Sequence, residues 1–99
     1  MNGDPLNVIK EADLSLFEQI NRNHELAFQD GEITAKNKLL IALAIDAAHH
    51  AEDGIKSLAI LALKAGATKN EILETLRIVN FICGVGSIYA AAGALEDIL

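Results

Sequence analysis

The chain has 99 residues, and its 14 Asp and Glu outnumber its 8 Lys and Arg, which gives a net charge of −6. This length suits a single domain and excludes a multi-domain enzyme. An acidic chain without a basic stripe releases few counterions from a phosphate backbone, so we expect no nucleic-acid binding. Hydrophobic residues make up 52% of the chain and aromatic residues only 4%, a composition typical of helix bundles built from Ala, Leu and Ile.

The single cysteine, Cys83, allows no internal disulfide, and the first ten residues lack the basic and apolar regions of a signal peptide. We therefore expect a cytoplasmic protein. Residues 78–95 carry no formal charge, but they are rich in Ala and Gly rather than Leu and Phe and include Asn80 and Ser87. We interpret this stretch as a closely packed helix and expect no membrane span.

Residues 1–12 show no sustained period, so we expect a flexible N-terminal arm ahead of one helical domain over residues 13–99. From Leu14 to Phe28, apolar residues recur at three- and four-residue steps, and Gly31 follows as a helix stop. This pattern predicts a first amphipathic helix.

Thr34 can cap a second helix, whose middle over residues 39–45 is apolar on every face. A helix of this kind must be central. It ends in the polar cluster 49–54, which we place at a corner between helices, and a third helix then runs from near Glu52 and stops at Gly66.

Thr68 and Glu71 form a capping box that predicts the start of a fourth helix. One face of that helix carries apolar residues at helical spacing: Ile72, Leu76, Val79 and Cys83. The glycines in residues 84–86 break it before a fifth segment that ends at Leu99. No β-period occurs in the sequence.

Residues 39–45 and 78–95 lack the polar face that a lone small bundle turns to water. One copy of this chain supplies too little surface to bury both stretches. The sequence therefore predicts a homo-oligomer.

Four blocks resemble the carboxymuconolactone decarboxylase family, which includes the AhpD-like alkylhydroperoxidases: Asp30–Ile33 (DGEI), Lys36–Ala44 (KNKLLIALA), Ala62–Ile72 (ALKAGATKNEI) and Cys83–Ala90 (CGVGSIYA). The similarity covers about residues 28–95. It implies a small all-α fold of five to six helices that assembles as trimers or hexamers.

Peroxidase members of that family use a Cys-x-x-Cys-x-x-x-His motif at the start of the third helix. Counting back from Gly66 puts the two cysteines at Ala51 and Gly54 and the histidine at Leu58. In such a motif the helix N-terminus and the imidazole lower a thiol pKa so that a thiolate attacks peroxide, and the second cysteine resolves the sulfenic acid. The family's upstream Glu falls at Lys38. The resemblance thus implies the fold without the peroxidase site.

Five titratable side chains form what we call the corner cluster: Asp46, His49, His50, Glu52 and Asp53. On a continuous helix Asp46 faces both histidines, and His49 faces Asp53. A histidine paired with a carboxylate can act as a general acid or base, or bind a metal. The alternative is that the acidic residues only stabilise a helix N-terminus. No motif supplies the further ligands of a zinc site, so we predict neither a metal nor a cofactor.

Cys83 lies on an apolar face, where burial makes a thiol inert, and we interpret it as packing material. The alternative is a reactive thiol, which needs His49 or His50 close by. We assign His24, beside Phe28 on the first helix, no catalytic role.

The sequence leaves three functions open, and with them the question of whether the protein is an enzyme. The first is a relative without redox activity that binds a small molecule, or serves as a structural subunit, within a homo-oligomer. The second is a non-redox acid/base lyase of the carboxymuconolactone decarboxylase type that uses the corner cluster. The third is a one-cysteine antioxidant peroxidase that acts through Cys83.

Overall fold

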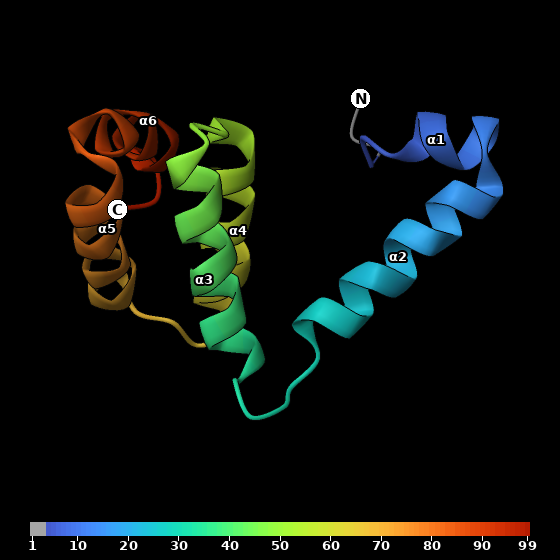
Figure 1. The fold of residues 1–99 in the computed structure, drawn as a ribbon, viewed down its shortest axis with the longest axis horizontal. Helices are drawn as coiled ribbons and strands as arrows, with labels where there is room; N and C mark the ends of the chain where they lie inside the picture. The colour runs from blue at the N-terminus through green and yellow to red at the C-terminus, as the bar shows by residue number, and fades with distance from the viewer. Residues whose placement is uncertain (1–3) are drawn as a thin grey trace.

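The structure is a computed structural model that describes residues 4–99, and within them it contains six helices and no strand (Figure 1). In chain order the helices are α1 (Asn7–Ala12), α2 (Leu14–Phe28), α3 (Ala35–Ala48), α4 (Glu52–Lys64), α5 (Lys69–Cys83) and α6 (Val85–Leu95). The all-helical prediction is confirmed. Of the predicted N-terminal arm, residues 1–3 lie outside the described residues and residues 7–12 form α1.

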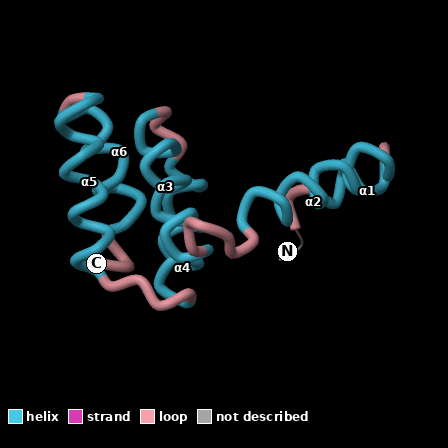
Figure 2. The backbone as a smooth tube through the Cα atoms, turned by 60° about the horizontal axis from the view of Figure 1, so that its bottom comes forward, coloured by secondary structure: helices cyan, strands magenta, loops and turns pink. Residues whose placement is uncertain are grey.

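Helices α3 to α6 pack together as the body of the molecule, whereas α1 and α2 project from it as an arm (Figures 1 and 2). The most deeply buried large side chains all come from the body: Leu43, Ile55, Ile72 and Leu95. Helix α3 contacts α4, α5 and α6, so the predicted central helix is confirmed. Its apolar run is only partly covered, because Ile41 and Ile45 on one side remain exposed.

Capping side chains fix where these helices begin, as the sequence predicts. The Thr34 hydroxyl accepts from the Asn37 N–H at 3.3 Å at the start of α3. The capping box of α5 is complete, because Thr68 Oγ1 accepts from the Glu71 N–H at 3.0 Å and Glu71 Oε1 accepts from the Thr68 N–H at 2.9 Å. Each bond satisfies a backbone donor that the first helical turn leaves unpaired. Gly66, at a φ of 102°, follows the end of α4.

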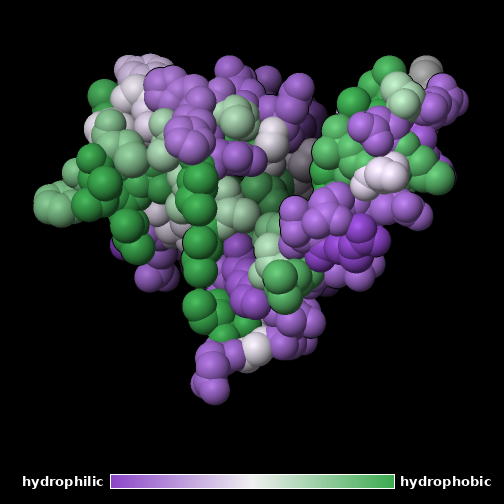
Figure 3. Space-filling view, turned by 45° about the vertical axis from the view of Figure 1, so that its right-hand side comes forward, coloured by the Kyte–Doolittle hydropathy of each residue, from purple (hydrophilic) through white to green (hydrophobic). Residues whose placement is uncertain are grey.

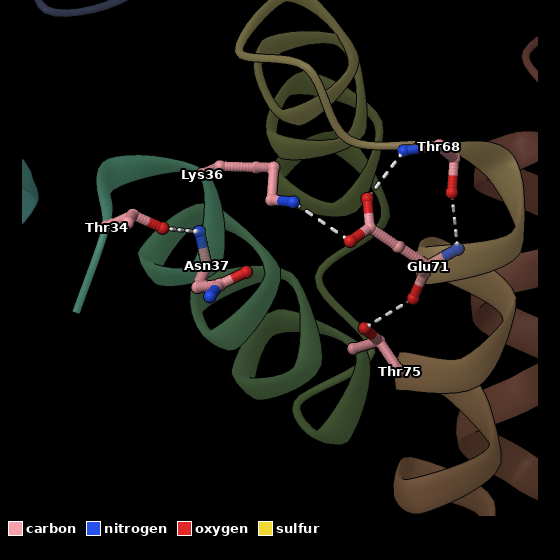
Figure 4. A network of polar contacts seen from close by, with 6 residues as sticks. All are labelled: Thr34, Lys36, Asn37, Thr68, Glu71 and Thr75. Atoms are coloured by element: carbon pink, nitrogen blue, oxygen red, sulfur yellow. Dashed lines mark hydrogen bonds and ion pairs between the residues drawn. The ribbon is translucent and has the colours of Figure 1, made fainter.

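An ion pair joins the first turns of α3 and α5 (Figure 4). Lys36 Nζ donates to Glu71 Oε2 at 2.9 Å, and both side chains are about one-third exposed. The Lys36 hydrogen bond lowers the pKa of the Glu71 carboxyl, and the hydrogen bond from the Thr68 backbone lowers it further. Glu71 therefore holds its own helix start and fastens it to α3.

We expect Glu71→Gln to lower the melting temperature at neutral pH by a few degrees. Because the folded-state pKa of Glu71 is lowered, its contribution is fully present above its unfolded-state pKa and is lost as the pH falls through the folded-state value. The difference between the variant and the wild type should therefore shrink on acidification, as thermal unfolding across a pH series would measure. Glu74→Gln, an exposed carboxylate on the same helix, is the matched control. A difference that stays constant with pH contradicts this role.

Candidate functional site

The corner between α3 and α4 determines where the titratable side chains lie. Helix α3 ends at Ala48, and His50 takes a left-handed backbone conformation with a φ of 57°. The His50 N–H donates to the Ala47 carbonyl at 3.1 Å and the Ala51 N–H donates to the Asp46 carbonyl at 2.9 Å. This is the bonding pattern of a Schellman motif, in which glycine usually occupies the left-handed position. His50 therefore occupies the position at which the chain reverses direction between α3 and α4.

The sequence-based pairing of carboxylates with histidines assumed a helix that continues past the corner. The structure corrects this assumption, because His49 and His50 lie beyond the last residue of α3. Within residues 4–99 the ion pair of Lys36 with Glu71 is the only one, so neither histidine pairs with Asp46 or Asp53. His49 and Asp53 are both exposed.

His50 instead lies against the first turn of α6. Its Nε2 is 3.4 Å from Ser87 Oγ, at the long end of hydrogen-bond distance. Ser87 is only 2% exposed and is the one buried polar residue in the described core. A methyl group at Gly86 would approach His50 Cε1 to 3.7 Å. Sequence reasoning gave Ser87 no role; its signal was a single hydroxyl in the otherwise apolar start of α6.

The Asp46 carboxylate lies over Gly54 in the first turn of α4. A methyl group built at Gly54 would overlap Asp46 Oδ2 and lie 2.9 Å from Asp46 Cγ. The carboxylate therefore occupies the volume that any larger side chain at position 54 would need. The positive end of the helix dipole favours an anion at this place, and Glu52 and Asp53 add two more carboxylates to the same turn.

The sequence-based interpretation of Cys83 as buried packing material is wrong. Ile72, Leu76 and Val79 on its face of α5 are buried, but Cys83 is exposed. Cys83 is the last residue of α5, and the chain turns at Gly84, whose φ is 90°, so the body does not cover the thiol.

Cys83 borders an open apolar groove between α3 and α5. Two clefts of about 300 and 210 Å³ share Ala44, Ile45 and Ile78, and we call their union the α3–α5 groove. It is lined by Leu40, Ile41, Ala44, Ile45, Ala48, Thr75, Ile78, Val79, Ile82 and Cys83. None of these side chains is charged and none is a histidine, so the groove offers the thiol no base.

A separate cleft of about 460 Å³ opens between α5 and α6. Its walls are mostly apolar, with two polar side chains: Leu73, Leu76, Arg77, Asn80, Val85 and Ile88. Arg77 is its only charged group, so the cleft combines apolar walls with one positive charge.

Two further properties concern the described part of the chain. No three His, Cys, Asp or Glu side chains within residues 4–99 converge so that they could hold a metal ion. None of the helices there is both long and apolar enough to cross a membrane.

The chain resembles known proteins over most of its length. The family model described as "Carboxymuconolactone decarboxylase family" matches residues 15–97. The fold is similar to the crystal structure of apo-lpg0406, a carboxymuconolactone decarboxylase family protein from Legionella pneumophila, with a TM-score of 0.86 and 31% sequence identity over 92% of this chain and 81% of that chain. No curated protein matches the chain. The family match spans the corner and the α3–α5 groove.

We expect Gly54→Ala to destabilise the protein, although replacing glycine by alanine in a helix ordinarily stabilises it by up to about 1 kcal/mol. The added methyl group displaces the Asp46 carboxylate, and overpacking of this kind costs about 1–3 kcal/mol. In an Asp46→Ala background the same exchange should become neutral or stabilising. Urea unfolding of the four proteins in this double-mutant cycle measures the reversal. Stabilisation by Gly54→Ala alone contradicts the placement of Asp46.

Proposed function

The chain belongs to the carboxymuconolactone decarboxylase family, and we propose that it is a homo-oligomeric, small-molecule-binding member without the family's thiol peroxidase site. The observation that carries this proposal is the Asp46 carboxylate over Gly54 at the start of α4. The resemblance assigns Gly54 to a motif cysteine and Ala51 and Leu58 to the other two motif positions. A carboxylate occupies the volume that a thiol there would need.

The electrostatics of this turn also support the proposal. A peroxidatic thiol depends on a positive environment that lowers its pKa. Here the first turn of α4 carries Glu52 and Asp53, and Asp46 adds a third negative charge from α3. A neighbouring negative charge disfavours a thiolate. This turn therefore lacks both the cysteine thiol and the positive environment that peroxide reduction by a thiol needs. The lyase hypothesis has less support, because neither corner histidine pairs with a carboxylate within residues 4–99.

Exposed hydrophobic side chains support the oligomer. Several of the largest lie on α5 and α6, where Phe81 is 86%, Tyr89 75% and Ile82 72% exposed. Apolar side chains gather over one face of the body in Figure 3. Monomeric proteins rarely expose contiguous patches of this kind. The cytoplasmic location expected from the sequence belongs to the same proposal.

The peroxidase part is tested by consumption of an organic hydroperoxide in the presence of a dithiol reductant. We expect no turnover by the wild type or by Cys83→Ser, because the exposed thiol lies in a groove without a histidine. A two-cysteine peroxidase in the same assay serves as the positive control. Turnover by the wild type that disappears in Cys83→Ser would overturn this part and establish the one-cysteine mechanism.

The ligand-binding part is supported by the cleft between α5 and α6, because its volume lies within the range of small-molecule sites. Its apolar walls and Arg77 suit a compact ligand with one carboxylate. We expect small aromatic and aliphatic carboxylates at millimolar concentration to raise the melting temperature of the wild type but not of Arg77→Gln. Arg22→Gln on α2 is the matched control and should keep the increase. An increase that survives in Arg77→Gln, or none in the wild type, contradicts this site.

A further inference from the structure

We propose that the arm of one copy docks in the α3–α5 groove of a second copy, so that neighbouring copies exchange their arms. This inference rests on the proposed homo-oligomer and specifies which surfaces meet in it. Among the apolar surfaces that the described structure leaves uncovered, one lies on the arm and another is the α3–α5 groove of the body. An apolar helix surface can fill an apolar groove, and the groove in turn excludes water from the helix surface.

The groove is open to solvent and uncharged. Its rim isoleucines are largely exposed, with Ile45 at 53% and Ile78 at 66%. Along α3 it extends from Leu40 to Ala48, a rise of about 12 Å at 1.5 Å per residue. Together its two clefts leave room for several inserted aliphatic side chains.

The arm presents a matching apolar stripe. Helix α2 has 15 residues and buries none of them, although an isolated helix of that length is marginal in water. One side of α2 carries Leu14, Leu16, Phe17, Ile20 and His24. Helix α1 packs against α2, with Lys10 Nζ 5.5 Å from the centre of the Phe17 ring. Leu14 and Leu16 remain about half exposed. From Leu14 to His24 the stripe rises about 15 Å, close to the length of the groove.

The connection to the body keeps the arm away from the groove of its own chain. Residues 29–34 are held by hydrogen bonds to both ends of the loop. Lys38 Nζ donates to the Gln29 carbonyl at 2.7 Å, and the Ala35 N–H donates to Asp30 Oδ1 at 2.6 Å. Both views of the backbone show α2 leaving the body on the side of α3 away from α5 (Figures 1 and 2). The stripe therefore meets a groove only on another molecule.

The charge of the chain also favours a second copy. Two molecules that each carry −6 repel one another where their charged surfaces meet. Neither the groove nor the stripe contains a carboxylate, a lysine or an arginine. Docking the stripe in the groove thus brings together two surfaces without negative charge, and the charge that lies over Phe17 of the stripe is the positive one of Lys10. Each exchanged arm buries one stripe and one groove. In a symmetric pair of copies, two stripes and two grooves are therefore buried.

The native thiol at the end of the groove allows a direct test. We would place the only thiol of one chain on the arm, as Leu16→Cys or His24→Cys in a Cys83→Ser background, and co-express it with a size-tagged wild-type chain. Mild oxidation should join the arm cysteine of one chain to Cys83 of the wild-type chain. We expect this disulfide for whichever of positions 16 and 24 lies next to Cys83 when the arm is docked. Arg22→Cys in the same background is the matched control, because it lies on the opposite face of α2, and it should give at least tenfold less.

Light scattering of the full chain separates the two proposals. We expect the wild type to contain several copies and Ile78→Glu, in the groove, to fall to a lower mass. Leu61→Glu makes the same change at an exposed leucine outside the groove and should keep the wild-type mass. A wild-type oligomer that gives no mixed disulfide from either stripe position overturns the arm exchange and leaves the oligomer standing. A wild type that is monomeric at every concentration overturns both.

Discussion

The contact between the Asp46 carboxylate and Gly54 is the constraint on which the arrangement of the site depends. Because position 54 has no side chain, the first turn of α4 can approach the last turns of α3 closely enough for the carboxylate to lie over it. The reversal is completed by His50 in a left-handed conformation, and that conformation brings its ring against Ser87 on α6. The missing Cβ of Gly54 thus leaves room for the Asp46 carboxylate between α3 and α4, and a larger residue at position 54 would have to displace that carboxylate.

The same contact separates the residues that pack α4 against α3 from those that lie at the start of α4. A helix N-terminus attracts negative charge, and either a thiolate or a carboxylate can supply it. In this chain three carboxylates, Asp46, Glu52 and Asp53, surround the first turn of α4. They leave the packing of α3 against α4 intact, because Ile55 and Ala59 on the buried face of α4 are unaffected by what lies at its start. The residues that pack α4 against α3 are thus different from those that determine the charge at its start.

The helices could be predicted because local signals determine their ends: the hydroxyl of Thr34, the capping box of Thr68 with Glu71, and Gly66. The site was harder to predict, because it depends on the backbone conformation of the corner between α3 and α4. Helical spacing paired Asp46 with the histidines, but a left-handed residue at His50 cannot be inferred from a periodicity that assumes helix throughout. The exposure of Cys83 was missed because apolar spacing along α5 does not show that the groove between α3 and α5 is open where Cys83 and Ala48 line it.

The apolar surface that remains uncovered bears on the stability of the chain itself. A domain of this size buries only about two-thirds of the surface of its unfolded chain, and here the arm contributes no fully buried residue to the core. Side chains such as Ile45 and Ile78 stabilise the folded chain only when something excludes water from them. If that partner is a second copy, association and folding are thermodynamically linked, and part of the stability depends on protein concentration. The apolar surfaces of the small body and of the projecting arm are then covered only where two molecules meet.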